Sequence, residues 1–202
     1  MTKKFLNKTY GLTTPEDLLA HYNAWAESYD AEVGDNGYAT PGRIAAALWA
    51  QYPDPFLDIL DFGCGTGLSG LALRAVGFET VDGTDPSPEM LAQAKAKEAY
   101  RTLTPLNINK PLTDGAYPVI VGCGVLSTGA APPETFSTIM KALPRGGLFA
   151  FSLNDHALAD PAYTQAINEW LDCGAARLLF KDYGAHLPGA DLKSEVYVIE
   201  KA

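Results

Sequence analysis

Apolar residues along the chain follow two alternating patterns. Short apolar runs, typical of strands buried in a parallel sheet, occupy 57–62, 79–84, 117–125 and 148–153. Between these runs, apolar residues recur at helical spacing, which predicts helices beginning near 14, 40, 67, 87, 132 and 160. Residues 101–109 are expected to add a short edge strand. Alternation of strands with helices predicts a parallel sheet with helices on both faces.

Capping residues support four of the expected helix starts. A Thr-Pro pair at 14–15 supplies an N-cap and a first helical position, and Asp17 completes a capping box. The same start signal recurs as Thr-Pro at 40–41, Ser-Pro at 87–88 and Asp-Pro at 160–161.

The end of the chain differs from the alternating part. Two strands are expected at about 175–181 and 194–200, joined by a Gly/Pro-containing loop at 184–190. Such a loop is too short for a helical crossover, so these strands should pair antiparallel. The expected fold is α/β and Rossmann-like, with a seven-stranded, mostly parallel sheet and an antiparallel C-terminal hairpin.

The first residues are expected to stand apart from this core. Residues 1–13 are predicted to form a loose arm, and the glycines at 34–37 should break the first helix. We expect one domain over 1–202, with 1–52 as an N-terminal helical cover and 53–202 as the Rossmann-like core.

A glycine-rich turn follows the first strand at 61–67, in the sequence DFGCGTG. Gly63, Gly65 and Gly67 let the backbone turn sharply and approach a ligand closely. The stretch 65–70 also satisfies GxGxxG, the dinucleotide fingerprint. Asp61 at the strand end suits S-adenosylmethionine (SAM), which carries an ammonium and a cationic sulfur, better than it suits a pyrophosphate.

Asp85 is a second anchor, 18 residues after Gly67 at the end of the next strand. A carboxylate there can accept hydrogen bonds from both ribose hydroxyls of a bound nucleoside. Because SAM and NAD share this ribose, Asp85 does not separate them. Asp82 is the rival for this role, although Asp85 is favoured because it lies where the strand meets the helix.

Composition narrows the classes of function. The chain has 202 residues, is 47% hydrophobic and 19% charged, and has a net charge of -9, which argues against nucleic acid as a partner. The three cysteines lack metal or disulfide spacing, so no metal is expected and a reducing, cytoplasmic location is predicted. Neither a signal peptide nor a membrane span is expected.

The chain resembles class I SAM-dependent methyltransferases over about residues 15–200. The matching stretches are ILDFGCGTG at 59–67, VDGTDPSPEML at 81–91, VIVGCGVL at 119–126 and LPRGGLFAFS at 143–152. The stretches HYNAWAESYD at 21–30 and GYATP at 37–41 look more particularly like methyltransferase-like proteins related to the Williams–Beuren-region methyltransferase. The resemblance implies a SAM-dependent methyltransferase with a class I fold.

The resemblance also implies which residues bind the cofactor. The methionine part of SAM would be lined by Asp61, Gly63, Cys64, Gly65 and Gly67. Asp85 would bind the ribose, and the backbone of Cys123 would lie near the sulfonium. The adenine would be contacted by Pro86, Met90, Asn107 and Ile108. Asn107 stands where the family usually has Asp, so this contact loses a charge. Tyr29 would cover the cofactor as part of the aromatic stripe formed with Tyr22 and Trp25. That stripe could equally be ordinary helix packing.

His156 follows the fifth strand, and the carboxyl ends of strands are where such a sheet builds its site. A neutral imidazole there could act as a base if the methyl acceptor must lose a proton. The alternative is a surface histidine in a loop. His21 and His186 have weaker claims, as do the substrate-side candidates at 182–183.

The function expected from these features is methyl transfer from SAM to a small-molecule acceptor. A sulfonium is already an activated leaving group, so catalysis would rest chiefly on alignment and desolvation. One alternative is a SAM-binding protein without transferase activity. An NAD-linked oxidoreductase is disfavoured by the acid before the glycines and by the terminal hairpin.

Overall fold

The computed structural model describes residues 5–9, 11–12, 14–108, 110 and 112–202. Within these residues, seven strands form one sheet in the order β3-β2-β1-β4-β5-β7-β6. The strands are β1 Ile59–Phe62, β2 Val81–Asp85, β3 Thr102–Pro105, β4 Val119–Gly122, β5 Leu148–Asn154, β6 Ala176–Leu187 and β7 Leu192–Lys201. Only β7 runs against its neighbours, since it pairs antiparallel with both β5 and β6. The predicted mostly parallel sheet with a C-terminal hairpin is confirmed.

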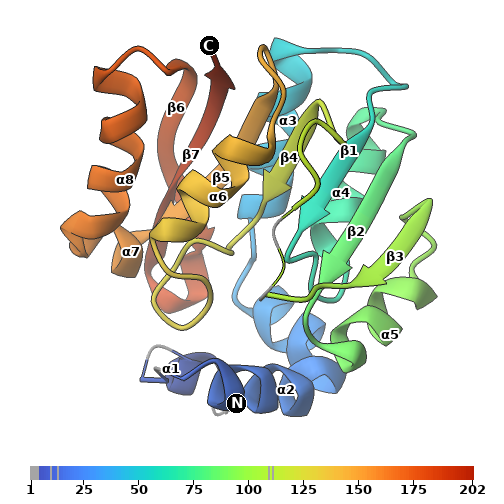
Figure 1. Cartoon of the computed structure of the whole chain (residues 1–202). Helices are drawn as coiled ribbons and strands as arrows, with labels where there is room; N and C mark the ends of the chain where they lie inside the picture. Colours follow the sequence, from blue (N-terminus) through green and yellow to red (C-terminus); the bar gives the residue numbers. More distant parts are fainter. Residues whose placement is uncertain (1–4, 10, 13, 109, 111) are drawn as a thin grey trace.

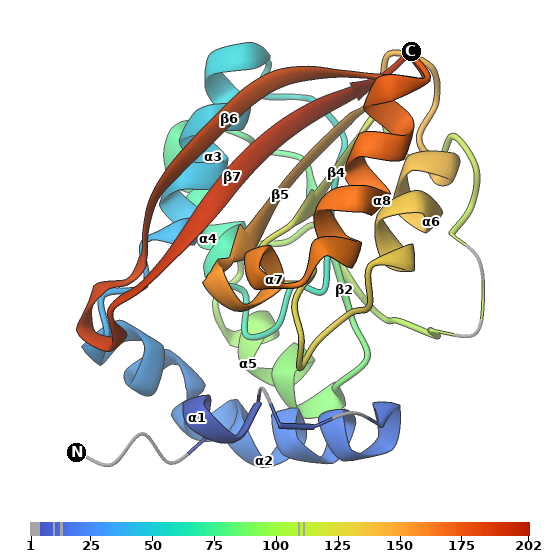
Figure 2. The same cartoon turned by 90° about the vertical axis from the view of Figure 1, so that its left-hand side faces the viewer.

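Helices cover both faces of this sheet and one of its ends (Figures 1 and 2). They are α1 Leu6–Thr9, α2 Pro15–Asp35, α3 Thr40–Gln51, α4 Leu68–Val76, α5 Pro88–Ala96, α6 Glu134–Ala142, α7 Asp155–Ala159, α8 Pro161–Asp172 and the 3-10 turn η1 Pro188–Ala190. Figure 1 shows α1 and α2 lying across the end of the molecule toward which the parallel strands point. This is the end where the glycine-rich turn lies.

Two apolar clusters hold the layers together. Phe136 and Ile139 of α6, with Ile167 of α8, pack against one face of the sheet. Leu48 of α3 and Leu73 of α4 pack against the opposite face. Helix α6 buries the apolar face that its spacing predicts, whereas α4 leaves Leu71 41% exposed and buries Leu73.

The packing of α3 bears on the expected division at residue 52. Ile44, Ala45 and Leu48 belong to the same buried cluster as Ile59 and Val119 of the sheet. Since α3 is a layer of the core, we propose that the covering segment comprises α1 and α2 and stops before Thr40. None of the helices in the described part of the chain is long and apolar enough to cross a lipid bilayer.

The N-terminal segment is more ordered than expected. Leu6–Thr9 forms the short helix α1, while residues 1–4, 10 and 13 of the predicted loose arm lie outside the described residues. The break predicted at 34–37 begins later, because α2 continues through Gly34 to Asp35. Thr14 caps α2 as predicted, accepting from the Asp17 backbone N–H at 3.1 Å.

Thr40 does not cap α3 as predicted. The N-cap of α3 is Ala39, and Thr40 is the first residue of the helix. The Thr40 hydroxyl instead bonds to the Nδ1 atom of His186 at 2.7 Å. The Thr40 hydroxyl therefore bonds to a residue far along the chain instead of capping the helix.

The C-terminal hairpin is much longer than predicted. β6 continues to Leu187 and β7 begins at Leu192, so most of the loop expected at 184–190 is strand. A Cβ on Gly184 would lie 3.0 Å from the Arg43 guanidinium, so glycine leaves room for this side chain against the strand. The extension carries His186 beyond the body of the sheet toward α2.

Candidate active site

The glycine-rich turn leaves β1 with three left-handed residues. Gly63, Gly65 and Gly67 have φ of +71°, +52° and +93°, a region that favours glycine. A Cβ on Gly63 would lie 2.5 Å from Val125, so the loop after β4 packs tightly on the turn. A Cβ on Gly65 would meet nothing within 4 Å. The turn therefore has open space above Gly65.

Asp61 lies beneath this turn with no exposed surface. Its Oδ2 atom accepts hydrogen bonds from the Ser69 hydroxyl at 2.5 Å and the Tyr100 hydroxyl at 2.7 Å. Its Oδ1 atom is buried without a hydrogen-bond partner among the described residues. Burial raises the pKa of Asp61 to about 6, against the opposing effect of these two hydrogen bonds. An unpartnered carboxylate oxygen is suited to an ammonium donor.

Asp85 ends β2 on the other side of the turn. Its Oδ2 atom accepts from the Gly65 backbone N–H and its Oδ1 atom from the Ser87 backbone N–H, both at 2.9 Å. Burial raises the pKa of Asp85, while these two bonds oppose the rise. Since each carboxylate oxygen can accept a second bond, Asp85 retains capacity for two ribose hydroxyls.

Asp82, the alternative to Asp85, has a structural role. Burial opposes its ionisation, but hydrogen bonds from Arg101, Thr102 and Tyr117 outweigh burial and lower the pKa of Asp82 to about 2. The Arg101 guanidinium also bonds to Asp58 at 2.8 Å. Asp82 therefore ties β2 to the chain around β3 rather than facing the turn.

The remaining predicted cofactor residues surround the same end of the sheet. Met90 is 2% exposed on α5, whereas Pro86 just before that helix is exposed. Asn107 and Ile108 are both exposed after β3. Cys64 is buried within the turn. Their roles in binding the cofactor stay predictions.

Helix α2 is fastened to the glycine-rich turn by charged and polar contacts. Asp30 accepts a hydrogen bond from the Thr66 hydroxyl at 2.5 Å and pairs with the Lys97 ammonium at 2.6 Å. Lys97 also donates to the Thr66 carbonyl at 2.7 Å. Sequence patterns do not predict this contact, because the three residues belong to three separate segments. Together they hold α2 over the turn.

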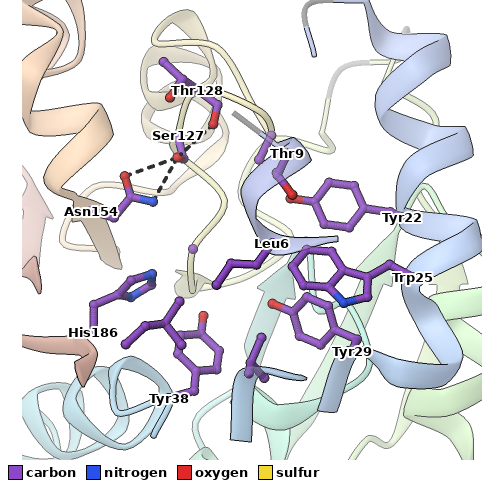
Figure 3. Close-up of a pocket in the computed structure, with 14 residues that line it drawn as sticks. Leu6, Thr9, Tyr22, Trp25, Tyr29, Tyr38, Ser127, Thr128, Asn154 and His186 are labelled. Carbon is purple, nitrogen blue, oxygen red and sulfur yellow. Dashed lines mark hydrogen bonds between the residues drawn. The ribbon is translucent and has the colours of Figure 1, made fainter. Parts of the chain in front are cut away.

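A pocket lies between α2 and the ends of β4, β5 and β6 (Figure 3). Tyr22, Trp25 and Tyr29 of α2 form one wall, so the aromatic stripe is both helix packing and pocket lining. The facing wall contains Ser127, Asn154 and His186, as Figure 3 shows. Gly124 also lines the pocket, one residue before the Val125 that packs on the glycine-rich turn. The pocket and the turn thus share one loop.

Tyr38 closes this pocket near β4. Its hydroxyl lies 3.5 Å from the Sγ atom of Cys123, and its ring packs edge-on against His186 with centroids 5.3 Å apart. Burial raises the pKa of the Cys123 thiol to about 12. Burial also raises the pKa of the Tyr38 hydroxyl well above its usual value. Both groups are therefore neutral at cellular pH.

The candidate histidines differ in burial and in position relative to the pocket. His156 is exposed on α7 and is not among the residues that line the pocket. His186, given a weaker claim from the sequence, is 5% exposed and lines it. Continued strand alternation through 183–187 was the signal that could have found it. His21 hydrogen-bonds to the Thr9 hydroxyl at 2.9 Å. The Tyr183 hydroxyl donates to Asp155, and neither of these two residues is among those that line the pocket.

Comparison with known proteins decides the family. A family profile described as a methyltransferase domain matches residues 37–189. The human methyltransferase-like protein 27 is 31% identical over 168 residues, which cover 81% of this chain and 68% of that protein. The chain belongs to the class I SAM-dependent methyltransferases.

Two further comparisons place this methyltransferase among its relatives. The tRNA U34 carboxymethyltransferase of Psychromonas ingrahamii is 34% identical over 141 residues, 65% of this chain but only 43% of that enzyme. The structure of magnesium protoporphyrin IX methyltransferase from Synechocystis, determined with bound SAM, has a TM-score of 0.61 and 19% identity, covering 100% of this chain and 98% of that one. This second likeness concerns the fold alone.

The residues of this methyltransferase fit its cofactor, SAM. The open space above Gly65, the unpartnered Oδ1 of Asp61 and the carboxylate of Asp85 offer room, an ammonium acceptor and ribose acceptors. The choice between SAM and NAD that the glycine pattern left open is thereby settled by the family. The expected class I SAM-dependent methyltransferase is confirmed.

Proposed function

We propose that this methyltransferase modifies a small molecule held in the pocket beneath α2. The observation that carries the proposal is the pocket itself. It combines an aromatic wall from Tyr22, Trp25 and Tyr29 with a polar wall that includes Ser127 and His186. Apolar walls with a few placed polar groups are typical of sites for small organic ligands.

The lining carries no formal charge in the described part of the chain. It comprises Leu6, Thr9, Tyr22, Trp25, Tyr29, Val33, Tyr38, Gly124, Ser127, Thr128, Ala130, Asn154, His186 and Leu187. Burial lowers the pKa of His186 to about 4, so this imidazole is also neutral at cellular pH. Flat aromatic walls favour a planar acceptor.

A nucleic-acid acceptor fits the chain less well. The Psychromonas relative is named for action on tRNA, but the net charge of -9 here opposes a phosphate backbone. Among the described residues, the pocket lining includes neither a lysine nor an arginine. These features support the sequence-based expectation that no nucleic acid is a partner, and this expectation stays a prediction. The cytoplasmic location also stays a prediction.

The protein needs to contribute little chemistry of its own to the methyl transfer. SAM, when bound, supplies a methyl group on a sulfonium that needs no further activation. The chain must align the acceptor with that methyl and exclude water, which α2 does by covering the turn and the pocket together. The sequence-based assignment of His156 as a base stays a prediction, and its exposed position gives it less support than a residue in the lining would have.

Filling the pocket tests the proposal. Ala130→Phe places a ring in the lining, whereas Ala159→Phe adds the same ring on exposed α7 and serves as the control. With a small-metabolite extract, Ala130→Phe should abolish formation of S-adenosylhomocysteine while SAM affinity, measured by calorimetry, is kept. Full turnover by Ala130→Phe would mean that the acceptor binds elsewhere.

A further inference from the structure

A chain of hydrogen bonds runs from Arg43 to the ring of His186. The Nη1 atom of Arg43 lies 3.0 Å from the Ser194 hydroxyl oxygen. That oxygen lies 3.1 Å from the Thr40 hydroxyl oxygen, which in turn lies 2.7 Å from the Nδ1 atom of His186. The sidechains come from α3, β6 and β7, so the chain forms only in the folded hairpin.

The direction of these bonds follows from the inventory of donors. A guanidinium can only donate, so the Ser194 oxygen accepts from Arg43. Ser194 has no exposed surface, and Thr40 is its other hydroxyl partner among the described residues, so Ser194 donates its proton to Thr40. Thr40 then donates to Nδ1 of His186. The reverse order would leave the buried Ser194 proton without an acceptor in the described part of the chain, which buried hydroxyls avoid.

This direction fixes the tautomer of His186. A neutral imidazole carries one proton, and Nδ1 is occupied as an acceptor, so the proton lies on Nε2. The neutral form is favoured by burial and by the nearby charge of Arg43, which both lower the pKa of His186 to about 4. No described residue bonds to Nε2, and Figure 3 shows the ring projecting toward the pocket. The pocket therefore receives an N–H donor at this point.

A second donor in the lining is also unpartnered. Trp25 is 2% exposed, and its indole N–H has no hydrogen-bond partner among the described residues. Carboxylates, which would satisfy such donors, do not occur in the described lining. A ligand that supplies an acceptor atom at His186 would therefore pair with a donor for which the described lining offers no partner.

We propose that His186 donates its Nε2–H to the methyl acceptor, which presents an unprotonated oxygen at this end of the pocket. Such an oxygen belongs to a carbonyl, a carboxylate or a phenolate. His186 then selects the acceptor rather than removing a proton from it, and Thr40 and Ser194 are positioning residues that set the tautomer. The proposal rests on the small-molecule function above and names the chemical class of its substrate.

The tautomer can be measured without any methyl transfer. Nitrogen-15 NMR distinguishes protonated from unprotonated ring nitrogens, and the chain has only three histidines to assign. His21→Asn and His156→Asn variants remove the other two signals one at a time. At neutral pH we expect His186 with a protonated Nε2 and an unprotonated, hydrogen-bonded Nδ1. A protonated Nδ1, or a doubly protonated ring, would overturn the proposal.

Paired variants separate a tautomer effect from a packing effect. Thr40→Ser keeps the hydroxyl and should keep the Nε2–H tautomer. Thr40→Val keeps the shape of the side chain but removes the donor, so the ring should lose its fixed tautomer. If the folded Thr40→Val protein shows the same nitrogen spectrum as the natural chain, the hydrogen-bond chain does not set the tautomer and the proposal fails.

The substrate class is read from the product. His186→Gln, whose amide can place an N–H near Nε2, should keep transfer within a few fold, whereas His186→Leu should lower it roughly 3- to 10-fold, the worth of one hydrogen bond. The labelled product should carry a carbonyl, carboxyl-derived or phenolic oxygen. A methylated alkylamine without such an oxygen would overturn the proposal while leaving the methyltransferase function intact. If the spectrum shows the expected His186 tautomer but no small molecule is methylated, the small-molecule function is wrong, and with it the role of His186 toward the acceptor.

Discussion

Asp30 on α2 accepts a hydrogen bond from Thr66 in the glycine-rich turn, with the two oxygen atoms 2.5 Å apart. Lys97 of the segment after α5 pairs with the same carboxylate at 2.6 Å. The helix that lines the pocket is thus tied to the glycine-rich turn, where we propose that the cofactor binds.

Removing this tie should loosen α2. Asp30→Ala breaks both contacts, and because the Asp30–Lys97 pair is partly exposed we expect a loss of only about 0.5–1 kcal/mol, or roughly two- to fivefold faster hydrogen exchange in α2. Glu27→Ala, an exposed acid on the same helix, is the matched control. S-adenosylhomocysteine should slow exchange in α2 of the natural chain. Equal exchange with and without this ligand would show that α2 does not respond to the cofactor site.

Asp85 should be the main anchor of the cofactor ribose. Asp85→Ala removes both acceptor oxygens, so SAM affinity should fall by about 1.5–3 kcal/mol, the range for hydrogen bonds to a charged group. Titration calorimetry measures this loss directly. A folded Asp85→Ala variant with unchanged affinity would remove Asp85 from the site.

Asp82→Ala is the control, because this acid lies on the same strand but bonds to Arg101, Thr102 and Tyr117. It should lower the melting temperature and leave SAM affinity unchanged. Since the folded-state pKa of Asp82 is lowered to about 2, its stabilising effect is present above pH 3.8 and is lost as the pH falls toward 2. Equal acid stability of Asp82→Ala and the natural chain would contradict this assignment.

Asp61 should make SAM binding pH-dependent. The pKa of Asp61 is raised to about 6, so below pH 6 the ligand-free protein holds a proton that an approaching ammonium must displace. Affinity should then fall by up to about tenfold for each pH unit below 6. Asp61→Asn keeps an oxygen for Ser69 and Tyr100 but should bind SAM more weakly and lose this component of the pH dependence. Identical pH profiles for both proteins would refute the role of the unpartnered oxygen.

The turnover of a His156 variant distinguishes the two readings of this residue. If His156 is a surface residue outside the pocket lining, His156→Ala should leave transfer within about twofold of the natural rate. A general base would instead contribute roughly 10²–10⁴ to the rate. A loss of that size in a folded His156→Ala variant, with SAM affinity kept, would restore His156 as the base.

Much of the fold is predictable because local signals agree with the global structure. The strand runs, the cap at Thr14 and the glycine at 77 that ends α4 all act within a few residues of chain. The glycine-rich turn and Asp85 could be placed for the same reason, since both lie at strand ends. The residues proposed to bind the cofactor can therefore be predicted largely from short sequence motifs.

The pocket proposed for the methyl acceptor could not be predicted from short motifs, because it is assembled from segments that lie far apart in the sequence. Thr40 has the sequence context of a cap, yet its hydroxyl is taken by His186, 146 residues later. The glycine at 184 looks like a loop signal but allows Arg43 to pack against a strand. Contacts of this kind depend on the length of the hairpin, which short-range patterns underestimate.

The central claim is that methyl groups pass from SAM to a small molecule bound beneath α2. The most direct measurement incubates the protein with methyl-labelled SAM and a cell extract separated into small metabolites, RNA and protein. The account predicts label in the small-metabolite fraction, strongly reduced with Asp85→Ala at low SAM concentration, absent with Ala130→Phe, and present with Ala159→Phe. Label found only in the RNA or protein fraction would contradict it.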